Sequence, residues 1–307
     1  MEKRHFRISI QIVLGIALFG FASVFFSSCK DSEEEFLAEN VQASNNESTV
    51  EAASDELDDL ARFALDAEDP ASGGRIRGIQ DDRLACDGTT IVFTNVSTDR
   101  SSGTATITFG PNGCTDNRGN VRKGTVVVTW EGGKWYEQGS THTITLQNYS
   151  LNNIGIEGTR TLNCFSAEGT LSSFTIQWYL SATHNFSWPD NSTGSRLVNK
   201  TKKWEHGPGA DTYTISNGPS GDNAAEGTNR HGTSYTMSIT TPLVYKAACV
   251  LSSKVFLPVS GVKLFTNVDT EKTMTIDFGD GTCDNTFTVS VEGASRTITA
   301  RNDSSGD

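Results

Sequence analysis

The sequence has few prolines and no excess of positive charge. It holds 7 Pro and 29 Gly in 307 residues, without a three-residue period, which excludes a collagen-like or proline-rich linker protein. Its 25 Lys and Arg residues stand against 37 Asp and Glu residues, giving a formal net charge of −12. A nucleic-acid-binding protein needs a basic face, so this balance argues against nucleic acid as a partner.

The motifs of several common enzyme classes are also missing. There is no Gly-x-Ser-x-Gly elbow, no phosphate-binding loop and no dinucleotide fingerprint. No two histidines recur at the three- or four-residue spacing of a zinc site. We therefore expect no metal and no cofactor, and the sequence favours a protein that is not an enzyme.

The negative charge is concentrated in one segment. Residues 30–72 hold 14 acids and 2 basic residues and account for −12, whereas residues 1–29 carry +2 and residues 73–307 carry −2. The bulk of the chain is therefore close to neutral. The acidity of the whole sequence says little about what that bulk binds.

The N-terminus has the layout of a secretory signal peptide. Basic residues among the first seven precede an apolar run from Ile8 to Phe26, and small residues precede Cys29. The run also approaches the length of a membrane-spanning helix, which is the alternative. Residues 26–29, Phe-Ser-Ser-Cys, resemble the lipobox of bacterial lipoproteins. That resemblance implies a signal peptide over 1–28 and a mature protein anchored in the membrane by acyl chains on Cys29.

The residues that follow Cys29 suggest where in the cell envelope the protein is located. Residues 29–35, Cys-Lys-Asp-Ser-Glu-Glu-Glu, resemble the acidic export signal of Bacteroidota surface lipoproteins, and a solvated acidic spacer is the alternative. Residues 124–160 also resemble uncharacterised lipoproteins of the Bacteroidota. These resemblances imply an outer-membrane location with cell-surface exposure, and they imply no activity.

An acidic tether is expected over residues 29–84. Within it, apolar residues recur at helical spacing and predict a short helix over 49–66. The acids of this helix lie three and four residues apart and repel one another. The helix either docks on the main domain or holds that domain away from the membrane. The apolar positions are Val50, Ala53, Leu57, Leu60, Ala61, Ala64 and Leu65.

Residues 85–307 predict an all-β domain. Short β-branched and aromatic runs alternate with Gly- and Asn-rich turns, and no helical crossover is visible, so the expected fold is a large antiparallel meander or sandwich. The candidate strands include Thr90–Val96, Thr104–Phe109, Gly124–Trp130, Thr141–Tyr149, Ile154–Leu162, Thr170–Leu180, Asp211–Ser216, Ser234–Thr240, Ser260–Phe265, Thr273–Phe278, Phe287–Glu292 and Ser295–Ala300.

A strand–loop–strand–turn unit occurs twice, at residues 93–117 and 265–285. Phe109 and Cys114 of the first copy match Phe278 and Cys283 of the second. Either the two copies pair and close one sheet, or the chain holds two related subdomains. Residues 276–282 resemble the structural strand-turn motif of PKD-type sandwiches. The nearby carboxylates Asp277, Asp280 and Asp284 are a weak calcium alternative, because the first copy replaces two of them.

Five cysteines remain after Cys29. Disulfides are the default in an exported protein, and each repeat copy has one cysteine upstream and one in its turn. This pattern predicts the pairs Cys86–Cys114 and Cys249–Cys283. Cys164 is left over, either as a buried free thiol or as a sign that the pairing is wrong.

All five tryptophans fall between residues 130 and 204. Trp130 and Trp178 lie on expected strands and are assigned to the core. Three others lie beside Lys or Pro and are candidate ligand-binding residues, because aromatic faces combine apolar area with a polar edge. These candidates are Trp135, Trp188 and Trp204. Next to the last of them, a basic cluster is expected either in a solvated loop or against an acidic glycan or lipid headgroup: Lys200, Lys202 and Lys203.

Together these features predict a lipid-anchored envelope protein that acts as a non-enzymatic binding or structural module, with a glycan or an envelope protein as ligand. In a structural role, the protein would add strands to a partner through exposed sheet edges. The alternative is a glycan-active hydrolase, which needs two facing carboxylates. The candidate carboxylates are Glu131, Glu137, Glu157 and Glu168.

Overall fold

The computed structural model describes residues 50–65 except 52 and 63, and residues 88–299 except 117–118, 171, 209, 220, 222, 250–254 and 256. The expected signal peptide 1–28, Cys29, Cys86 and most of the tether lie outside the described residues. Within the described part of the chain, no helix has the length and apolar character needed to cross a membrane.

The described residues form one antiparallel sheet of 15 strands, so the all-β prediction is confirmed. The strands follow one another as a meander, β1-β2-β4-β5-β6-β7-β8-β10-β11-β12-β13-β14-β15, while β3 pairs with β4, and β9 pairs with β8 and β11. Their bounds are β1 (Thr90–Thr94), β2 (Gly103–Thr108), β3 (Cys114–Thr115), β4 (Val121–Glu131), β5 (Thr141–Leu151), β6 (Ile154–Thr170), β7 (Ser173–Ser187), β8 (Thr193–Gly207), β9 (Ala210–Asn217), β10 (Ala225–Thr228), β11 (Ser234–Lys246), β12 (Ser260–Asn267), β13 (Thr273–Asp280), β14 (Thr286–Val291) and β15 (Ala294–Thr299).

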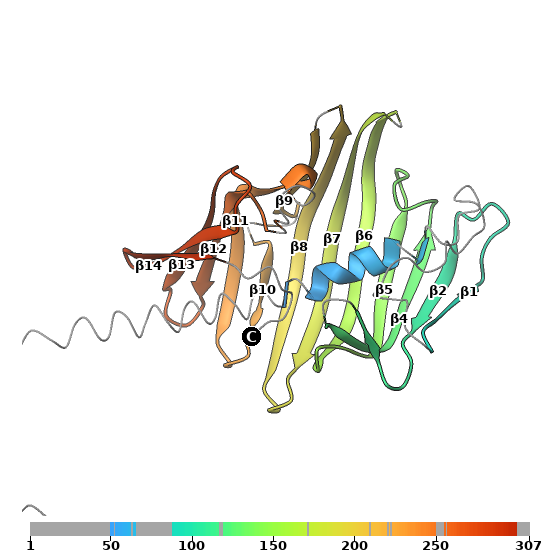
Figure 1. Ribbon diagram of the computed structural model, residues 1–307, viewed down its shortest axis with the longest axis horizontal. Coiled ribbons are helices and arrows are strands. Elements are labelled where there is room, and N and C mark those ends of the chain that lie inside the picture. Colours follow the sequence, from blue (N-terminus) through green and yellow to red (C-terminus); the bar gives the residue numbers. More distant parts are fainter. Residues whose placement is uncertain are drawn as a thin grey trace, which may run out of the picture.

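One helix lies across the face of this sheet, over the long central strands (Figure 1). Its described residues fall between 50 and 65, within the segment where the spacing predicts a helix. Leu57, Leu60 and Ala64 are fully buried and belong to the same hydrophobic cluster as Ile107 and Val126 of the sheet. We call this element the docked helix, and the sheet face that it covers the inner face.

The strands alternate buried and exposed residues, as expected when only one face of a sheet is covered. In β7 every second side chain from Ile176 to Phe186 is buried. The buried residues form two large clusters. One cluster joins the docked helix to the half of the sheet nearest β1, and the other covers the half that runs from β7 to β14.

The two repeat copies lie in the same sheet and do not pair with each other. The first copy contains the β1–β2 hairpin at one edge, and the second contains the β12–β13 hairpin near the other. The copies belong to one sheet, but the strands from β4 to β11 separate them, so neither expected arrangement describes this placement fully.

The cysteines follow the expected framework as far as they are described. Cys249 and Cys283 form a disulfide. Cys114 is also disulfide-bonded, and its expected partner Cys86 lies outside the described residues. Cys164 is a buried free thiol. Burial raises its pKa to about 11, which keeps it protonated and unreactive at neutral pH.

Two central strands differ from the sequence prediction. The expected strand Thr170–Leu180 begins instead after a tight turn, in which Thr170 pairs with Ser173, and it continues to Ser187. Strand β8 occupies residues for which the sequence predicts no strand. Both strands are 15 residues long, and they provide much of the inner face.

Candidate ligand-binding cleft

A row of basic side chains crosses the inner face beneath the docked helix. In β8 the alternation of a strand turns Arg196, Lys200 and Lys202 inward. Arg122 on β4 and Arg160 on β6 point to the same face and are only 1% exposed. A buried cation is costly unless a carboxylate pairs with it, so the row needs acidic partners.

The docked helix supplies those partners. Glu51 forms ion pairs with Lys200 and Lys263, and its carboxylate lies 3.8 Å from the guanidinium of Arg196. These cations come from β8 and β12, which are three strands apart in the sheet order. One helical carboxylate therefore connects two strands that are not neighbours in the sheet.

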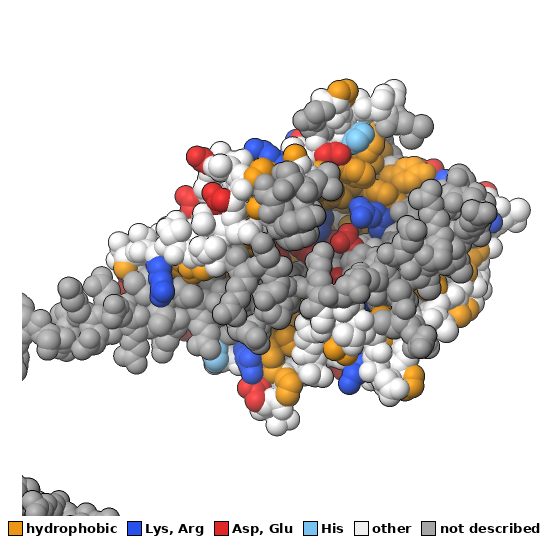
Figure 2. Space-filling model, in the orientation of Figure 1, with side chains coloured by type: hydrophobic (Ala, Val, Ile, Leu, Met, Phe, Trp, Pro, Cys, Tyr) orange, Lys and Arg blue, Asp and Glu red, His pale blue; other side chains and the backbone are white. Residues whose placement is uncertain are grey.

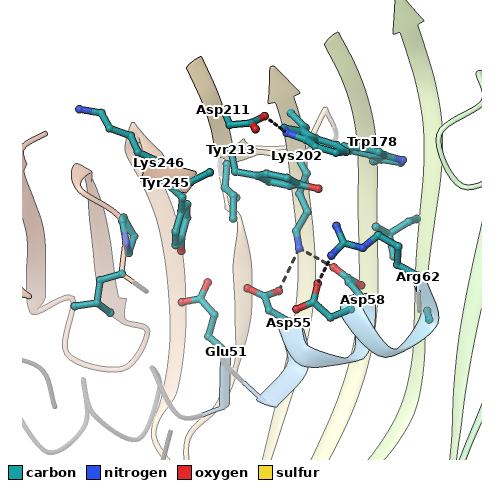
Figure 3. Close-up of a pocket in the computed structure, with 18 of the residues that line it drawn as sticks. Glu51, Asp55, Asp58, Arg62, Trp178, Lys202, Asp211, Tyr213, Tyr245 and Lys246 are labelled. Atoms are coloured by element: carbon teal, nitrogen blue, oxygen red, sulfur yellow. Dashed lines mark hydrogen bonds and ion pairs between the residues drawn. The ribbon is translucent and has the colours of Figure 1, made fainter. Parts of the chain in front are cut away.

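One turn further along, two acids share two cations. Asp58 accepts hydrogen bonds from Nε and a terminal nitrogen of Arg160, at 2.5 and 2.7 Å, and from Lys202 Nζ at 2.6 Å. Asp55 accepts from the same Arg160 at 2.7 Å. Figure 3 shows Lys202 reaching down between the two carboxylates.

A third group fixes the helix to β4. Glu56 accepts two hydrogen bonds from Arg122, from Nε at 2.5 Å and from a terminal nitrogen at 2.9 Å. The other terminal nitrogen donates to Asp116 at 2.9 Å. This forked geometry is the strongest that a carboxylate and a guanidinium can form.

These contacts correct the expectation for the basic cluster. Lys200 and Lys202 are neither in a solvated loop nor available to a glycan or lipid headgroup, because they face inward on β8 and bind the docked helix. Only Lys203 points outward, where it pairs with Glu205. The acids of the helix likewise do not simply repel one another, since each of Glu51, Asp55 and Asp58 faces cations of the sheet.

The network fixes the charge state of these acids. Burial alone would raise the pKa of the Glu51 carboxyl, but Lys200 and Lys263 hold it well below its ordinary value. Burial likewise opposes ionisation of Asp55 and Asp58, and the neighbouring Lys202 and Arg160 overcome it and lower both pKa values. All three groups are therefore ionised at neutral pH.

Aromatic side chains gather above this network. Trp135 lies 6.0 Å, centroid to centroid, from both Trp178 and Trp204, with ring planes 23° and 11° apart. Tyr213 stacks beside Trp178 and Trp204 at 6.4 and 5.8 Å. Arg62 of the docked helix lies 5.7 Å over the Trp135 ring. We call these four rings the Trp wall.

A cleft of about 620 Å³ opens between the Trp wall and the far half of the sheet, with the docked helix along one side. Its opposite wall is apolar and includes Leu257, Ile276, Phe278 and Phe287. Figure 2 shows hydrophobic side chains meeting acidic and basic ones in a recess on this face. In Figure 3, Tyr213 and Tyr245 lie above the carboxylates of the helix.

Few polar groups in the cleft are left without partners among the described residues. The hydroxyls of Tyr213 and Tyr245 make no hydrogen bond there, and burial raises both pKa values, so the phenols stay neutral donors. Nε2 of His142, which also lines the cleft, is buried without a partner in that part of the chain. Burial lowers the pKa of His142 to about 4, so the ring is neutral.

The structure brings together two of the three candidate tryptophans. Trp135 and Trp204 are half-buried members of the Trp wall. Trp188 is half-buried elsewhere, beside Phe186 and under the guanidinium of Arg230. Trp130 and Trp178 are core residues, 5% and 3% exposed.

The candidate carboxylates for hydrolysis and for calcium lie outside the cleft. Four of them are exposed on strands or turns and line no part of it: Glu131, Glu137, Glu157 and Glu168. Asp277, Asp280 and Asp284 each accept hydrogen bonds within their own turn. Among the described residues no three metal-ligating side chains converge on a metal site.

Comparison with protein-family models, with curated proteins and with solved structures finds no match.

Proposed function

We propose that the protein is a lipid-anchored, non-enzymatic binding module of the cell envelope, and that its ligand occupies the cleft beside the Trp wall. The observation that carries this proposal is the cleft itself. A concave, mostly apolar site of a few hundred Å³ with a small number of polar groups is the usual form of a small-molecule site. The cleft of about 620 Å³ has that form.

The rival function, a glycan-active hydrolase, has less support. A glycosidase needs one carboxyl whose pKa is raised, so that it can donate a proton. Within the described cleft, Glu51, Asp55 and Asp58 have lowered pKa values and are held in ion pairs. A residue in that state does not act as a general acid near neutral pH.

Ligand binding is tested by a thermal-shift screen with oligosaccharides and uncharged amphiphiles. A ligand that binds only the folded state raises the melting temperature. We expect the shift to disappear in Trp204→Ala and Trp135→Ala. Trp188→Ala, a matched loss of one tryptophan outside the cleft, should keep the shift. A shift lost only in Trp188→Ala would place the ligand elsewhere and contradict the proposal.

The anchor is a separate part of the proposal. The lipobox-like residues 26–29 support acylation of Cys29, and the acidic residues after it support an outer-membrane, outward-facing location. We expect Cys29→Ser to release the protein from membranes and to change its mature mass. Unchanged membrane association and mass would show that Cys29 is not acylated.

A further inference from the structure

We infer that the cleft takes the apolar chain of an uncharged amphiphile, such as a fatty alcohol or a neutral lipid. The inference rests on the proposed binding function and adds the chemistry of the ligand. Three properties of the cleft lead to it: its walls, its charges and its small supply of free hydrogen-bonding groups.

Apolar side chains form both walls. The Trp wall stands on one side, and Leu257, Ile276 and Phe278 stand on the other, with Leu65 contributed by the docked helix. Each methylene that moves from water into such a site adds favourable binding free energy. A flexible alkyl chain can follow the space between two such walls along its whole length.

The charged groups of the cleft already have partners. Glu51, Asp55 and Asp58 are paired with sheet cations. At the rim, Lys246 Nζ donates to the carbonyl of Gly281 at 2.8 Å, and Asp211 accepts from Trp204 at 3.1 Å. An ionised ligand would have to break one of these contacts or bury an unpaired charge, and both are costly.

The supply of hydrogen-bonding groups is too small for a sugar. A buried hydroxyl without a hydrogen-bond partner is costly, and a saccharide carries several hydroxyls on every ring. Within the described lining, the neutral side-chain groups that make no hydrogen bond are the phenols of Tyr213 and Tyr245 and Nε2 of His142. These suffice for one neutral hydroxyl or amide, which is the polar part of an uncharged amphiphile.

Quenching of tryptophan fluorescence by bromododecanol tests the inference on the full chain. Bromine quenches tryptophan only at short range, and three of the five tryptophans line the cleft. We expect saturable quenching that excess unbrominated dodecanol reverses. The quenched fraction should fall in Trp135→Phe and Trp204→Phe and should not fall in Trp188→Phe.

A charged substitution on the apolar wall distinguishes binding of the alkyl chain in the cleft from binding elsewhere on the protein. Leu257→Asp should weaken bromododecanol binding at least about tenfold, equivalent to 1.4 kcal/mol. Val268→Asp, at a 54% exposed site outside the cleft, should leave it unchanged. Bromododecanoate, with the same chain and an ionised head, should bind at least about tenfold more weakly than the alcohol.

Three results would overturn the inference. Quenching that Leu257→Asp leaves unchanged would place the alcohol outside the cleft. Equal binding of the alcohol and the carboxylate would show that the paired charges of the cleft do not disfavour an ionised ligand. If bromododecanol fails to bind while a neutral oligosaccharide stabilises the wild type and not Trp204→Ala, the binding function stands and the ligand class is wrong. If neither probe binds, both proposals fall.

Discussion

At the residue scale, the inner face is held by charged side chains that are buried in pairs. Such pairs add little stability over an apolar substitute, but removing one partner leaves an uncompensated charge and is strongly destabilising. Glu51 is the most connected of them, because it faces Lys200, Lys263 and Arg196. Its loss should therefore have the largest effect of any single acid on the helix.

We expect Glu51→Gln to lower the free energy of unfolding by about 3–5 kcal/mol, because three buried cations would lose their carboxylate. Asp59→Asn on the same helix is the matched control. Asp59 is 53% exposed in its pair with Arg62, and exposed pairs contribute at most about 1 kcal/mol. Urea denaturation measures both variants, and equal effects would contradict the burial of Glu51.

The buried histidines predict a pH dependence. Burial lowers the pKa of His142 and of His184 to about 4 in the folded state, against about 6.5 in the unfolded chain. Between these values the unfolded chain binds more protons, so stability falls as the pH falls. From pH 7 to pH 5 each histidine should cost about 2 kcal/mol.

Urea denaturation at both pH values measures this effect. His142→Gln should flatten the pH dependence, and His231→Gln, on an exposed turn, should leave it unchanged. An unaltered slope in His142→Gln would show that burial does not lower the pKa of this ring. Below about pH 4, stability should fall further, because the lowered pKa values of Glu51, Asp55 and Asp58 contribute stability that is lost on protonation.

At the scale of elements, the sequence predicts most strands and misses the one that carries the most charge. Strand β8 reads as a polar, lysine-rich stretch, and charged residues are usually exposed. Its acidic partners lie about 145 positions earlier in the chain, so no local pattern shows that the lysines are buried. One signal was available: Glu51, Asp55 and Asp58 are spaced four and three apart and share one side of a helix.

The site itself was partly predictable. The clustering of tryptophans in the sequence led to Trp135 and Trp204, which meet in the Trp wall. Trp188 belongs to the same stretch of sequence, but it lies on the turn after β7 and packs against Phe186. Three residues of the opposite wall, Ile276, Phe278 and Phe287, come from β13 and β14, more than sixty residues further along the chain. Only the topology of the sheet brings those apolar residues to the cleft.

The pairing of β6 with β7 requires a glycine at position 158. Gly158 has φ +122°, and a Cβ there would lie 2.0 Å from the carbonyl oxygen of Thr183. Gly158→Ala should therefore cost several kcal/mol, beyond the roughly 1–2 kcal/mol for a positive φ alone. Gly293→Ala is the matched control, since Gly293 has φ +89° with open space around it. If thermal denaturation shows that Gly158→Ala and Gly293→Ala lose similar amounts of stability, then β6 and β7 accommodate the added Cβ without further cost.

At the scale of the whole molecule, the acidic segment has two roles. Its first residues are proposed to lead from a lipidated Cys29, but its helical part belongs to the folded domain and forms one side of the cleft. The formal charge of −12 therefore overstates how much free acid the segment presents, because sheet cations neutralise part of it. Ligand binding and helix docking share residues, so each should stabilise the other.

The docked helix binds the inner face of the sheet through buried ion pairs. This docking is tested by a double-mutant cycle on Glu56 and Arg122, which are 66 positions apart and joined by two hydrogen bonds. The free energies of unfolding of Glu56→Gln, Arg122→Met and the double variant should give a coupling energy of at least about 1 kcal/mol. Effects that add to within about 0.5 kcal/mol would mean that the two residues do not meet, and would contradict the docking of the helix.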